Sequence, residues 1–325
     1  MLYNRENKLH QRLKDERLNT MTKPVYKGIW PVAPTPFSAD GVVDYEGMIR
    51  VLDCMIDQGV DGICILANFS EQFLISDAER EQLTRVCLEH AGERIPLIVT
   101  ISHFATDIAV TRAKFAKQLG AEAVMMMAPY HGALLKGTAE QTYEQLARVG
   151  DVGIPIMIQD APLSGVELPV DFLIRVAKTI DMVKMFKIEC AGAAAKLRVL
   201  VDKGGAAIEA PFDGEEAITL LADLDAGARG SMTSALIPDL IRPVIFAHME
   251  GRRDEAVEGY SRLLPVINHE NRQCGFRAAK EAMVEGGVIK SAFCRHPIAP
   301  LHPQTRQALI ELMAPHDPVV LRWGK

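Results

Sequence analysis

The sequence predicts an α/β protein with a (β/α)8 TIM barrel and an appended layer of C-terminal helices, and three observations support this fold class. The chain has 325 residues, 48% of them hydrophobic and 24% charged, which is enough for one large core. From residue 27 onward, short apolar runs alternate with longer amphipathic stretches, as in repeated βα units. The GxGxxG turn of an open nucleotide-binding sheet is absent, which favours a closed barrel.

Eight strands are expected, and their runs are nearly continuous in hydrophobic residues. Parallel strands that are covered on both faces by other elements have this pattern, whereas half-exposed strands alternate apolar and polar residues. The expected strands span residues 28–33, 61–66, 96–101, 123–127, 154–159, 182–187, 206–209 and 228–232.

Signals for helix ends lie between these runs. The strings 76–79 (SDAE) and 138–141 (TAEQ) fit the capping box, in which a hydroxyl and the side chain three residues later satisfy free backbone N–H groups. Gly59 and Gly120 stand where helices should end, because glycine accepts the left-handed turn that closes a helix.

The chain is expected to divide into a polar leader over residues 1–26, a catalytic barrel over 27–237 and C-terminal helices over 238–325. The leader is dense in charges of both signs, which predicts either a weakly docked segment or a short helix on the barrel surface. Within the last part, the pattern predicts helices over the segments 253–266, 270–286 and 303–313.

Composition excludes several classes of protein. The net charge is −6, and no cluster of Lys and Arg marks a nucleic-acid surface. The six cysteines are scattered without a CxxC pair and lie mostly in apolar runs, which is typical of reduced core residues in the cytosol. No apolar stretch reaches the length of a membrane span, and the N-terminus lacks the apolar centre of a signal peptide. A cytoplasmic protein without nucleic-acid or membrane partners is expected.

The most informative polar residue is Lys187, which ends an apolar strand. Active sites of these barrels lie at the C-terminal ends of the strands. Strand alternation predicts that Lys187 faces the interior together with Met185 and Val183, while Lys184 points away. Burial would lower the pKa of such an amine and make it nucleophilic. The alternative is a structural lysine that pairs with a nearby Glu.

Five local patterns resemble the dihydrodipicolinate synthase and N-acetylneuraminate lyase family, over most of residues 27–300. Besides the strand-terminal lysine, they are the string 34–37 (PTPF), a Glu-ended loop after the second strand, SDAER at 76–80, APY at 128–130, and the segment from Pro155 to Pro162. The resemblance implies an eight-stranded barrel, a homotetramer, Lys187 as a Schiff-base lysine, a small 2-keto acid as substrate, and neither a metal nor an organic cofactor.

The sequence departs from the family at two places. Where the family has Gly-Thr-Thr-Gly-Glu to hold the substrate carboxylate, this chain has ANFSE at 67–71, so substrate binding is expected from Asn68, Phe69, Ser70 or main-chain N–H groups. Where the family has a proton-shuttling tyrosine, this chain has Gln159. A glutamine side chain orients a hydroxyl or a water, but it has no useful pKa for acid–base work.

These departures and the strings around them resemble the 2-keto-3-deoxy-L-arabonate dehydratase branch of the family. The reaction implied converts that sugar acid to 2-oxoglutarate semialdehyde (2,5-dioxopentanoate) and water. The alternatives are an aldolase that releases pyruvate, a 5-dehydro-4-deoxyglucarate-type dehydratase, and a non-catalytic sugar-acid binding protein. Gln159 disfavours the aldolase, because cleavage needs a base on the C4 hydroxyl.

A dehydratase needs a group that moves protons near the reacting carbons. Glu189 is the first candidate, because it lies two residues after Lys187 and should face the same side; its alternative role is that of an ion-pair partner. Tyr130 is the second candidate. His131 and Glu209 are expected at most to contact the substrate. The histidines show no HExxH spacing, so no metal site is expected.

Overall fold

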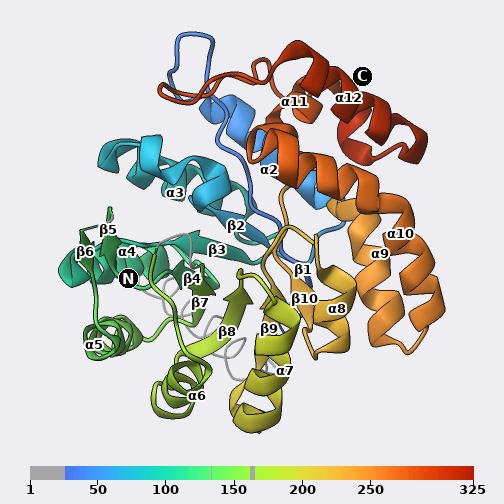
Figure 1. The fold of residues 1–325 in the computed structure, drawn as a ribbon. Helices are drawn as coiled ribbons and strands as arrows, with labels where there is room; N and C mark the ends of the chain where they lie inside the picture. Colours follow the sequence, from blue (N-terminus) through green and yellow to red (C-terminus); the bar gives the residue numbers. More distant parts are fainter. Residues whose placement is uncertain (1–25, 133, 162–164) are drawn as a thin grey trace, which may run out of the picture.

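A computed structural model of the chain describes residues 26–132, 134–161 and 165–325 (Figure 1). The predicted leader, apart from residue 26, lies outside these residues. Within them, eight parallel strands form one sheet in the order β1-β10-β9-β8-β7-β4-β3-β2. Their bounds are β1 (Gly28–Ile29), β2 (Ile63–Ile65), β3 (Leu97–Thr100), β4 (Ala123–Met126), β7 (Ile156–Asp160), β8 (Val183–Ile188), β9 (Ala210–Asp213) and β10 (Gly230–Ser231).

The sheet closes on itself beyond the end of β1. Val32 forms a parallel bridge with Cys64 of β2 and another with Ser234, which follows β10. The Ala33 N–H donates to the Cys64 carbonyl at 2.8 Å, and the Cys64 N–H donates to the Pro31 carbonyl at 2.9 Å. These bonds join the first and last strands of the order above, so the predicted barrel is confirmed.

Helices surround the barrel and connect its strands (Figure 1). Both predicted capping boxes are present, at the starts of α3 and α5. A short hairpin, β5 (Tyr130–His131) and β6 (Leu135–Lys136), precedes α5. The barrel helices are α2 (Tyr45–Asp57), α3 (Asp77–Ala91), α4 (Thr106–Gln118), α5 (Ala139–Gly150), α6 (Val170–Thr179), α7 (Ala193–Gly204), α8 (Leu220–Asp225) and α9 (Pro238–Met249). Short 3₁₀ turns are η1 (Asn68–Ser70), η2 (Gln72–Leu74), η4 (Gly205–Ala207), η6 (Ala314–His316) and η7 (Val319–Leu321).

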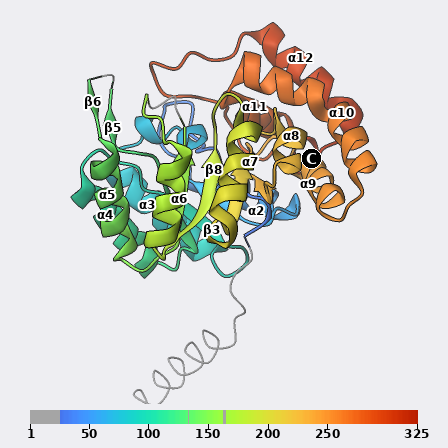
Figure 2. The ribbon, with the colours of Figure 1, turned by 60° about the horizontal axis from the view of Figure 1, so that its bottom comes forward.

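The C-terminal helices gather beside α9 on one side of the barrel (Figure 2). They are α10 (Arg253–His269), the π-helix η5 (Glu270–Cys274), α11 (Arg277–Glu285) and α12 (Pro303–Met313). The expected helices at 253–266 and 303–313 agree with α10 and α12, while 270–286 is split by η5. Helix α9 packs against β1 as a barrel helix does. The division of the chain at residue 238 stays a prediction.

One of the expected strands is wrong. The seventh was placed at 206–209, but β9 spans Ala210–Asp213, and Gly205–Ala207 form the turn η4. Strand β9 contains Pro211, which has no N–H to donate and is therefore atypical of a central strand. The C-terminal end of this strand is consequently Asp213 and not Glu209.

Strand β8 contains an irregularity that changes which side chains face inward. Its register with β7 shifts between the pairs Ile156–Val183 and Met157–Met185, so Lys184 is an extra residue. Met185 packs in the barrel interior, as expected, whereas Val183 packs with the core outside it. The expectation that Val183 shares the face of Lys187 is therefore wrong, because simple alternation does not cross a bulge.

A buried ion pair joins the C-terminal layer to the loop after β2. Lys280 of α11 and Glu71 are both inaccessible to solvent and form an ion pair, and the Lys280 ammonium donates to the Phe293 carbonyl at 2.9 Å. Replacing one partner leaves an uncompensated buried charge. We expect Lys280→Met to lower the free energy of unfolding by about 3 to 5 kcal/mol in urea titrations. The double variant Lys280→Met, Glu71→Leu should recover most of that loss; equal losses in both proteins would contradict this account.

Candidate active site

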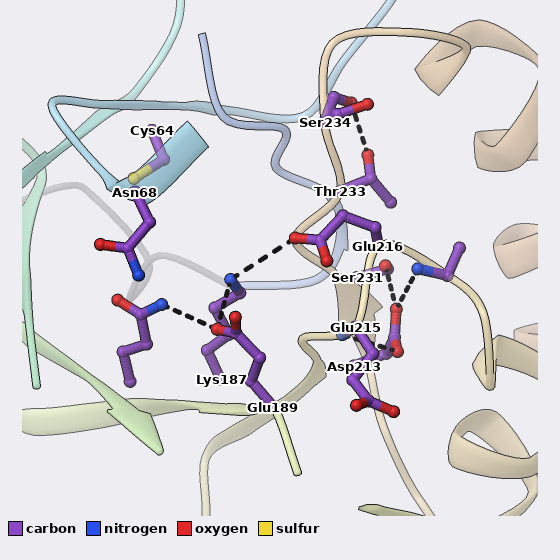
Figure 3. A network of polar contacts seen from close by, with 12 residues as sticks. Cys64, Asn68, Lys187, Glu189, Asp213, Glu215, Glu216, Ser231, Thr233 and Ser234 are labelled. Carbon is purple, nitrogen blue, oxygen red and sulfur yellow. Dashed lines mark hydrogen bonds and ion pairs between the residues drawn. The ribbon is translucent and has the colours of Figure 1, made fainter. Parts of the chain in front are cut away.

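Lys187 lies at the C-terminal end of β8, and its amine is held between two carboxylates (Figure 3). The Lys187 Nζ donates to Glu189 Oε2 at 2.8 Å and lies 3.9 Å from Glu216 Oε1. The lysine side chain is only 4% exposed. The position predicted for this lysine is therefore observed, and the expected neighbour Glu189 is in contact with it.

Close backbone packing holds the lysine in place. A Cβ atom added at Gly214 would stand 2.8 Å from the Lys187 Cγ and 2.8 Å from the Ile188 carbonyl oxygen. Real Cβ atoms essentially never make such short contacts, so only glycine fits here. Strand β9 places Phe212 beside Lys187 in the sheet register. The lack of a side chain at Gly214 thus leaves room for the stem of Lys187 at the strand end.

Gln159 of β7 supports the first carboxylate. Its Nε2 donates to Glu189 Oε2 at 2.7 Å, so one glutamate oxygen accepts from both the glutamine and the lysine. The Gln159 Oε1 is buried and has no hydrogen-bond partner within the described residues. A buried acceptor without a donor is costly, and a substrate hydroxyl could supply that donor.

The charge state of Lys187 differs from the expectation based on burial alone. Burial does favour a lower pKa for the amine, but the negative charges of Glu189 and Glu216 outweigh it, and the pKa of Lys187 is raised. The prediction of a lowered pKa in the free protein is therefore wrong. The amine becomes nucleophilic only when its proton passes to an adjacent group, and the Glu189 carboxylate is in hydrogen-bonding contact.

Glu216 was not singled out from the sequence. It follows β9 in a loop where Glu216 and Ala217 have positive φ angles of 49° and 67°, the left-handed region that non-glycine residues seldom occupy. Burial raises the pKa of Glu216 well above its usual value; Lys187 opposes this rise, and the nearby carboxylates reinforce it. The acidic string 213–216 (DGEE) could have indicated Glu216 as a site residue. Because the seventh strand was expected at 206–209, this string was not seen to lie at the end of a strand.

Asp213 holds this loop in its unusual conformation. Its carboxylate accepts from the Ala217 N–H at 3.2 Å and from the Glu215 N–H at 3.4 Å, and the Ser231 hydroxyl also donates to it (Figure 3). Burial raises the pKa of Asp213. The pKa of Asp223 is raised to about 8, mainly by burial and in second place by the negative charge of Asp213. Ser231, at the end of β10, therefore acts as a support for the loop.

The loop after β2 carries the residues expected to bind substrate. The Ser70 hydroxyl donates to the Ala33 carbonyl at 2.6 Å and accepts from the Ala67 N–H at 3.1 Å, so it is already occupied. Asn68 is better placed, because its Nδ2 has only a weak contact with Met127 Sδ at 4.0 Å. Phe69 packs edge-on against Phe276, with the ring centroids 6.3 Å apart.

Tyr130 and His131 form strand β5 in the hairpin after β4. Tyr130 is half-buried, His131 is exposed, and both line a cavity of about 390 Å³ at the C-terminal rim of the barrel. Among the described residues, the lining of that cavity does not include Lys187 or Glu189. Tyr130 and His131 thus lie at the same rim as Lys187, but they line a different cavity.

Glu209 does not belong to this group. It precedes β9, and its Oε1 accepts from Lys184 Nζ at 2.7 Å near the start of β8. Parallel strands begin at one end of a barrel and finish at the other, so this pair lies at the end opposite to the Lys187 amine. The expectation that Glu209 contacts the substrate depended on the misplaced seventh strand and is wrong.

Two further observations concern the described residues as a whole. No group of three or more His, Cys, Asp or Glu side chains there is arranged to hold a metal ion. None of the described helices combines the length and the apolar character needed to cross a membrane.

Comparisons with known proteins identify the family of the chain. The dihydrodipicolinate synthetase family matches residues 25–315. An L-2-keto-3-deoxyarabonate dehydratase from Azospirillum brasilense is 53% identical over 94% of this chain and 100% of its own length, and a 4-hydroxy-tetrahydrodipicolinate synthase from Streptomyces coelicolor is 28% identical over 86% and 92%. In fold, the dihydrodipicolinate synthase structure from Aquifex aeolicus has a TM-score of 0.83 at 24% identity, covering 90% of this chain and 99% of its own. The chain therefore belongs to the dihydrodipicolinate synthetase family.

Proposed function

We propose that this protein is a Schiff-base dehydratase that converts 2-keto-3-deoxy-L-arabonate to 2-oxoglutarate semialdehyde and water. The observation that carries the proposal is a buried lysine between two carboxylates, with a glutamine where the synthases of the family have a tyrosine. The 53% identity to the Azospirillum dehydratase over nearly the whole chain supports the same substrate.

Schiff-base formation begins with the loss of a proton from Lys187. The contact of 2.8 Å lets Glu189 take that proton, and the neutral amine then attacks the C2 ketone of the substrate. Glu189 then returns this proton to the hydroxyl of the adduct, which leaves as water, so an iminium forms and the Glu189 carboxylate is restored. The iminium withdraws electrons and acidifies the C3 protons. A buried amine favours this step because the surrounding protein excludes competing water.

The two carboxyl groups then catalyse the elimination of water from C3 and C4. The Glu189 carboxylate removes a C3 proton to give an enamine, and the protonated Glu216 donates to the C4 hydroxyl, which leaves as water. Loss of a C5 proton and protonation at C3 then give the C4–C5 enol, whose tautomerisation yields the C5 aldehyde. Hydrolysis of the iminium releases the product and Lys187. Burial raises the pKa of Glu216, which suits the acid role because a raised pKa favours the protonated carboxyl.

Gln159 distinguishes this reaction from retro-aldol cleavage. Cleavage between C3 and C4 needs a base that removes the C4 hydroxyl proton, which a glutamine cannot do. Its unpartnered Oε1 is instead suited to accept from a substrate hydroxyl and to orient it. The substrate carboxylate is assigned to the Asn68 amide and main-chain N–H groups of the η1 turn, with Phe69, Tyr130 and His131 as surrounding residues.

One assay tests the proposed function. Purified protein is incubated with 2-keto-3-deoxy-L-arabonate, and both 2-oxoglutarate semialdehyde and pyruvate are quantified. Semialdehyde without pyruvate is the expected result. Pyruvate with an aldehyde would identify an aldolase, turnover only of 5-dehydro-4-deoxyglucarate would identify the other dehydratase, and binding without either product would identify a sugar-acid binding protein.

We also propose that the protein works as a cytoplasmic homotetramer. Three large apolar side chains on the rim are exposed, namely Phe104, Leu134 at 90% and Leu135, and such residues are typical of protein contacts. All six cysteines are free thiols, as expected in a reducing compartment. Light scattering of the purified protein would check the assembly, and a monomer mass would exclude it.

A further inference from the structure

A chain of side-chain hydrogen bonds runs from helix α3 to the turn η1 at the active site. It begins at Arg80 of α3, which is buried, with 6% of it exposed. The Arg80 guanidinium donates to two neutral oxygens, the Thr100 carbonyl at 2.8 Å and Gln72 Oε1 at 3.2 Å. Gln72 Nε2 in turn donates to Asn68 Oδ1 at 2.7 Å. The proposed reaction gives no role to Arg80 or Gln72, although their bonds end at a residue that it uses.

The direction of these bonds follows from the charged group at the start of the chain. A guanidinium has only donors, so the atom of the Gln72 amide that faces Arg80 must be its oxygen. The Gln72 nitrogen therefore faces Asn68, and the Asn68 atom that accepts this bond must be its oxygen. The Asn68 Nδ2 is left on the other side of the amide, where it makes the weak contact with Met127 Sδ. Asn68 thus presents a donor and not an acceptor.

The polarity of the Asn68 amide matters because Asn68 lies at the active site. It begins the turn η1 after β2, and in the view of Figure 3 it lies on one side of Lys187 while Glu216 lies on the other. The proposed reaction assigns the substrate carboxylate, which only accepts hydrogen bonds, to this amide. A donor at Asn68 stabilises that carboxylate, whereas a reversed amide would place a carbonyl oxygen against its negative charge.

Gln159 is oriented in the same way but with the opposite polarity. Its anchor is the Glu189 carboxylate, which only accepts, so the Gln159 nitrogen faces Glu189 at 2.7 Å. The Gln159 oxygen is left without a hydrogen-bond partner within the described residues. The two amides therefore offer a donor at Asn68 and an acceptor at Gln159. A ligand that carries both a carboxylate and a hydroxyl satisfies the two together.

We propose that Arg80 and Gln72 are positioning residues for Asn68: the guanidinium fixes the Gln72 amide, and Gln72 fixes the Asn68 amide with its N–H groups toward the substrate. The chain thereby makes this part of the site selective for a carboxylate. The assignment of the carboxylate to Asn68 rests on the proposed function. Arg80 and Gln72 need not touch the substrate, and they make or break no bond in it.

The test measures binding of 2-keto-3-deoxy-L-arabonate by calorimetry in Lys187→Ala, which lacks the amine of the covalent intermediate, so that Kd is read without turnover. In this parent protein, we expect Gln72→Met to raise Kd about fivefold, because the Asn68 amide loses the bond that orients it. Gln72→Glu should raise Kd by about tenfold or more. A carboxylate accepts from both Arg80 and Asn68, which turns the Asn68 oxygen toward the substrate.

The order of these two effects separates orientation from packing. Glutamate keeps the size of glutamine and can still accept from Arg80, so a purely structural role for Gln72 predicts that Gln72→Glu is the milder change. Gln82→Glu is the control, because it adds the same charge at an exposed position of α3, and its Kd should match the parent protein. When Asn68→Ala is already present, Gln72→Glu should alter Kd by less than about twofold, because the amide through which Gln72 acts is gone.

Kinetics supply a second readout in protein that retains Lys187. Gln72→Met should raise KM about fivefold and keep kcat within about twofold of the wild type, because the carboxylate contact is made in both the bound substrate and the transition state. A parent-like Kd in both Gln72 variants, or an equal loss with and without the Asn68 amide, overturns this proposal. Absence of semialdehyde in the wild type overturns the proposed function alone, since Kd is measured without turnover.

Discussion

Replacing Lys187 with alanine is expected to lower kcat by roughly 10³-fold or more, because the variant lacks the amine that forms the covalent intermediate. The residue is buried, and in the proposed reaction its nitrogen stays bonded to the substrate from Schiff-base formation until the final hydrolysis. Two measurements check this result. Semialdehyde formation gives kcat, and borohydride reduction in the presence of substrate followed by peptide mass spectrometry shows whether residue 187 carries the adduct.

Lys184 provides a matched control on the same strand. Its amine pairs with Glu209 at the opposite end of the barrel, so Lys184→Ala should keep kcat within a few-fold of the wild type and should still trap the adduct at Lys187. A Lys187→Ala protein with wild-type turnover would rule out Schiff-base catalysis. If a folded Lys184→Ala protein neither turned over substrate nor trapped it, Lys184 would be the nucleophile instead.

Replacing Glu216 with glutamine should lower kcat by about 10²- to 10³-fold and leave adduct trapping intact. Glutamine preserves the shape of the side chain but has no proton to give to the C4 hydroxyl. Schiff-base formation precedes that step, so the covalent intermediate should accumulate. In the wild type, the same role predicts that kcat falls on the alkaline side, as the pH rises through the raised pKa of Glu216.

The adjacent carboxyl is the control for this variant. Glu215→Gln makes the same chemical change one residue earlier, on a side chain that lies outside the contact with Lys187. Its kcat should stay within a few-fold of the wild type. Equal losses in the two variants would indicate a general effect on the loop, and full activity of Glu216→Gln would assign the acid role to another group, such as Tyr130.

The sequence predicted most of the barrel because its signals are local. Apolar runs and capping boxes depend on residues close in the chain, and seven of the eight expected strands overlap those observed. The seventh strand was misplaced because Pro211 disguised it. That single error transferred attention from Asp213 and Glu216 to Glu209, which shows how a strand boundary decides which residues are taken to face the site.

The sequence alone determined the barrel architecture and a lysine at the end of a strand, with its side chain directed to the barrel interior. It also determined the neighbouring Glu189 and a glutamine at position 159, where the family has a tyrosine. Only the tertiary structure decided that the Ser70 hydroxyl is already bonded to backbone groups, and that Glu216 reaches the lysine from a loop with left-handed backbone angles. Side-chain periodicity is a property of neighbouring residues, whereas the charge that an amine experiences depends on carboxylates brought near by the packing of distant segments.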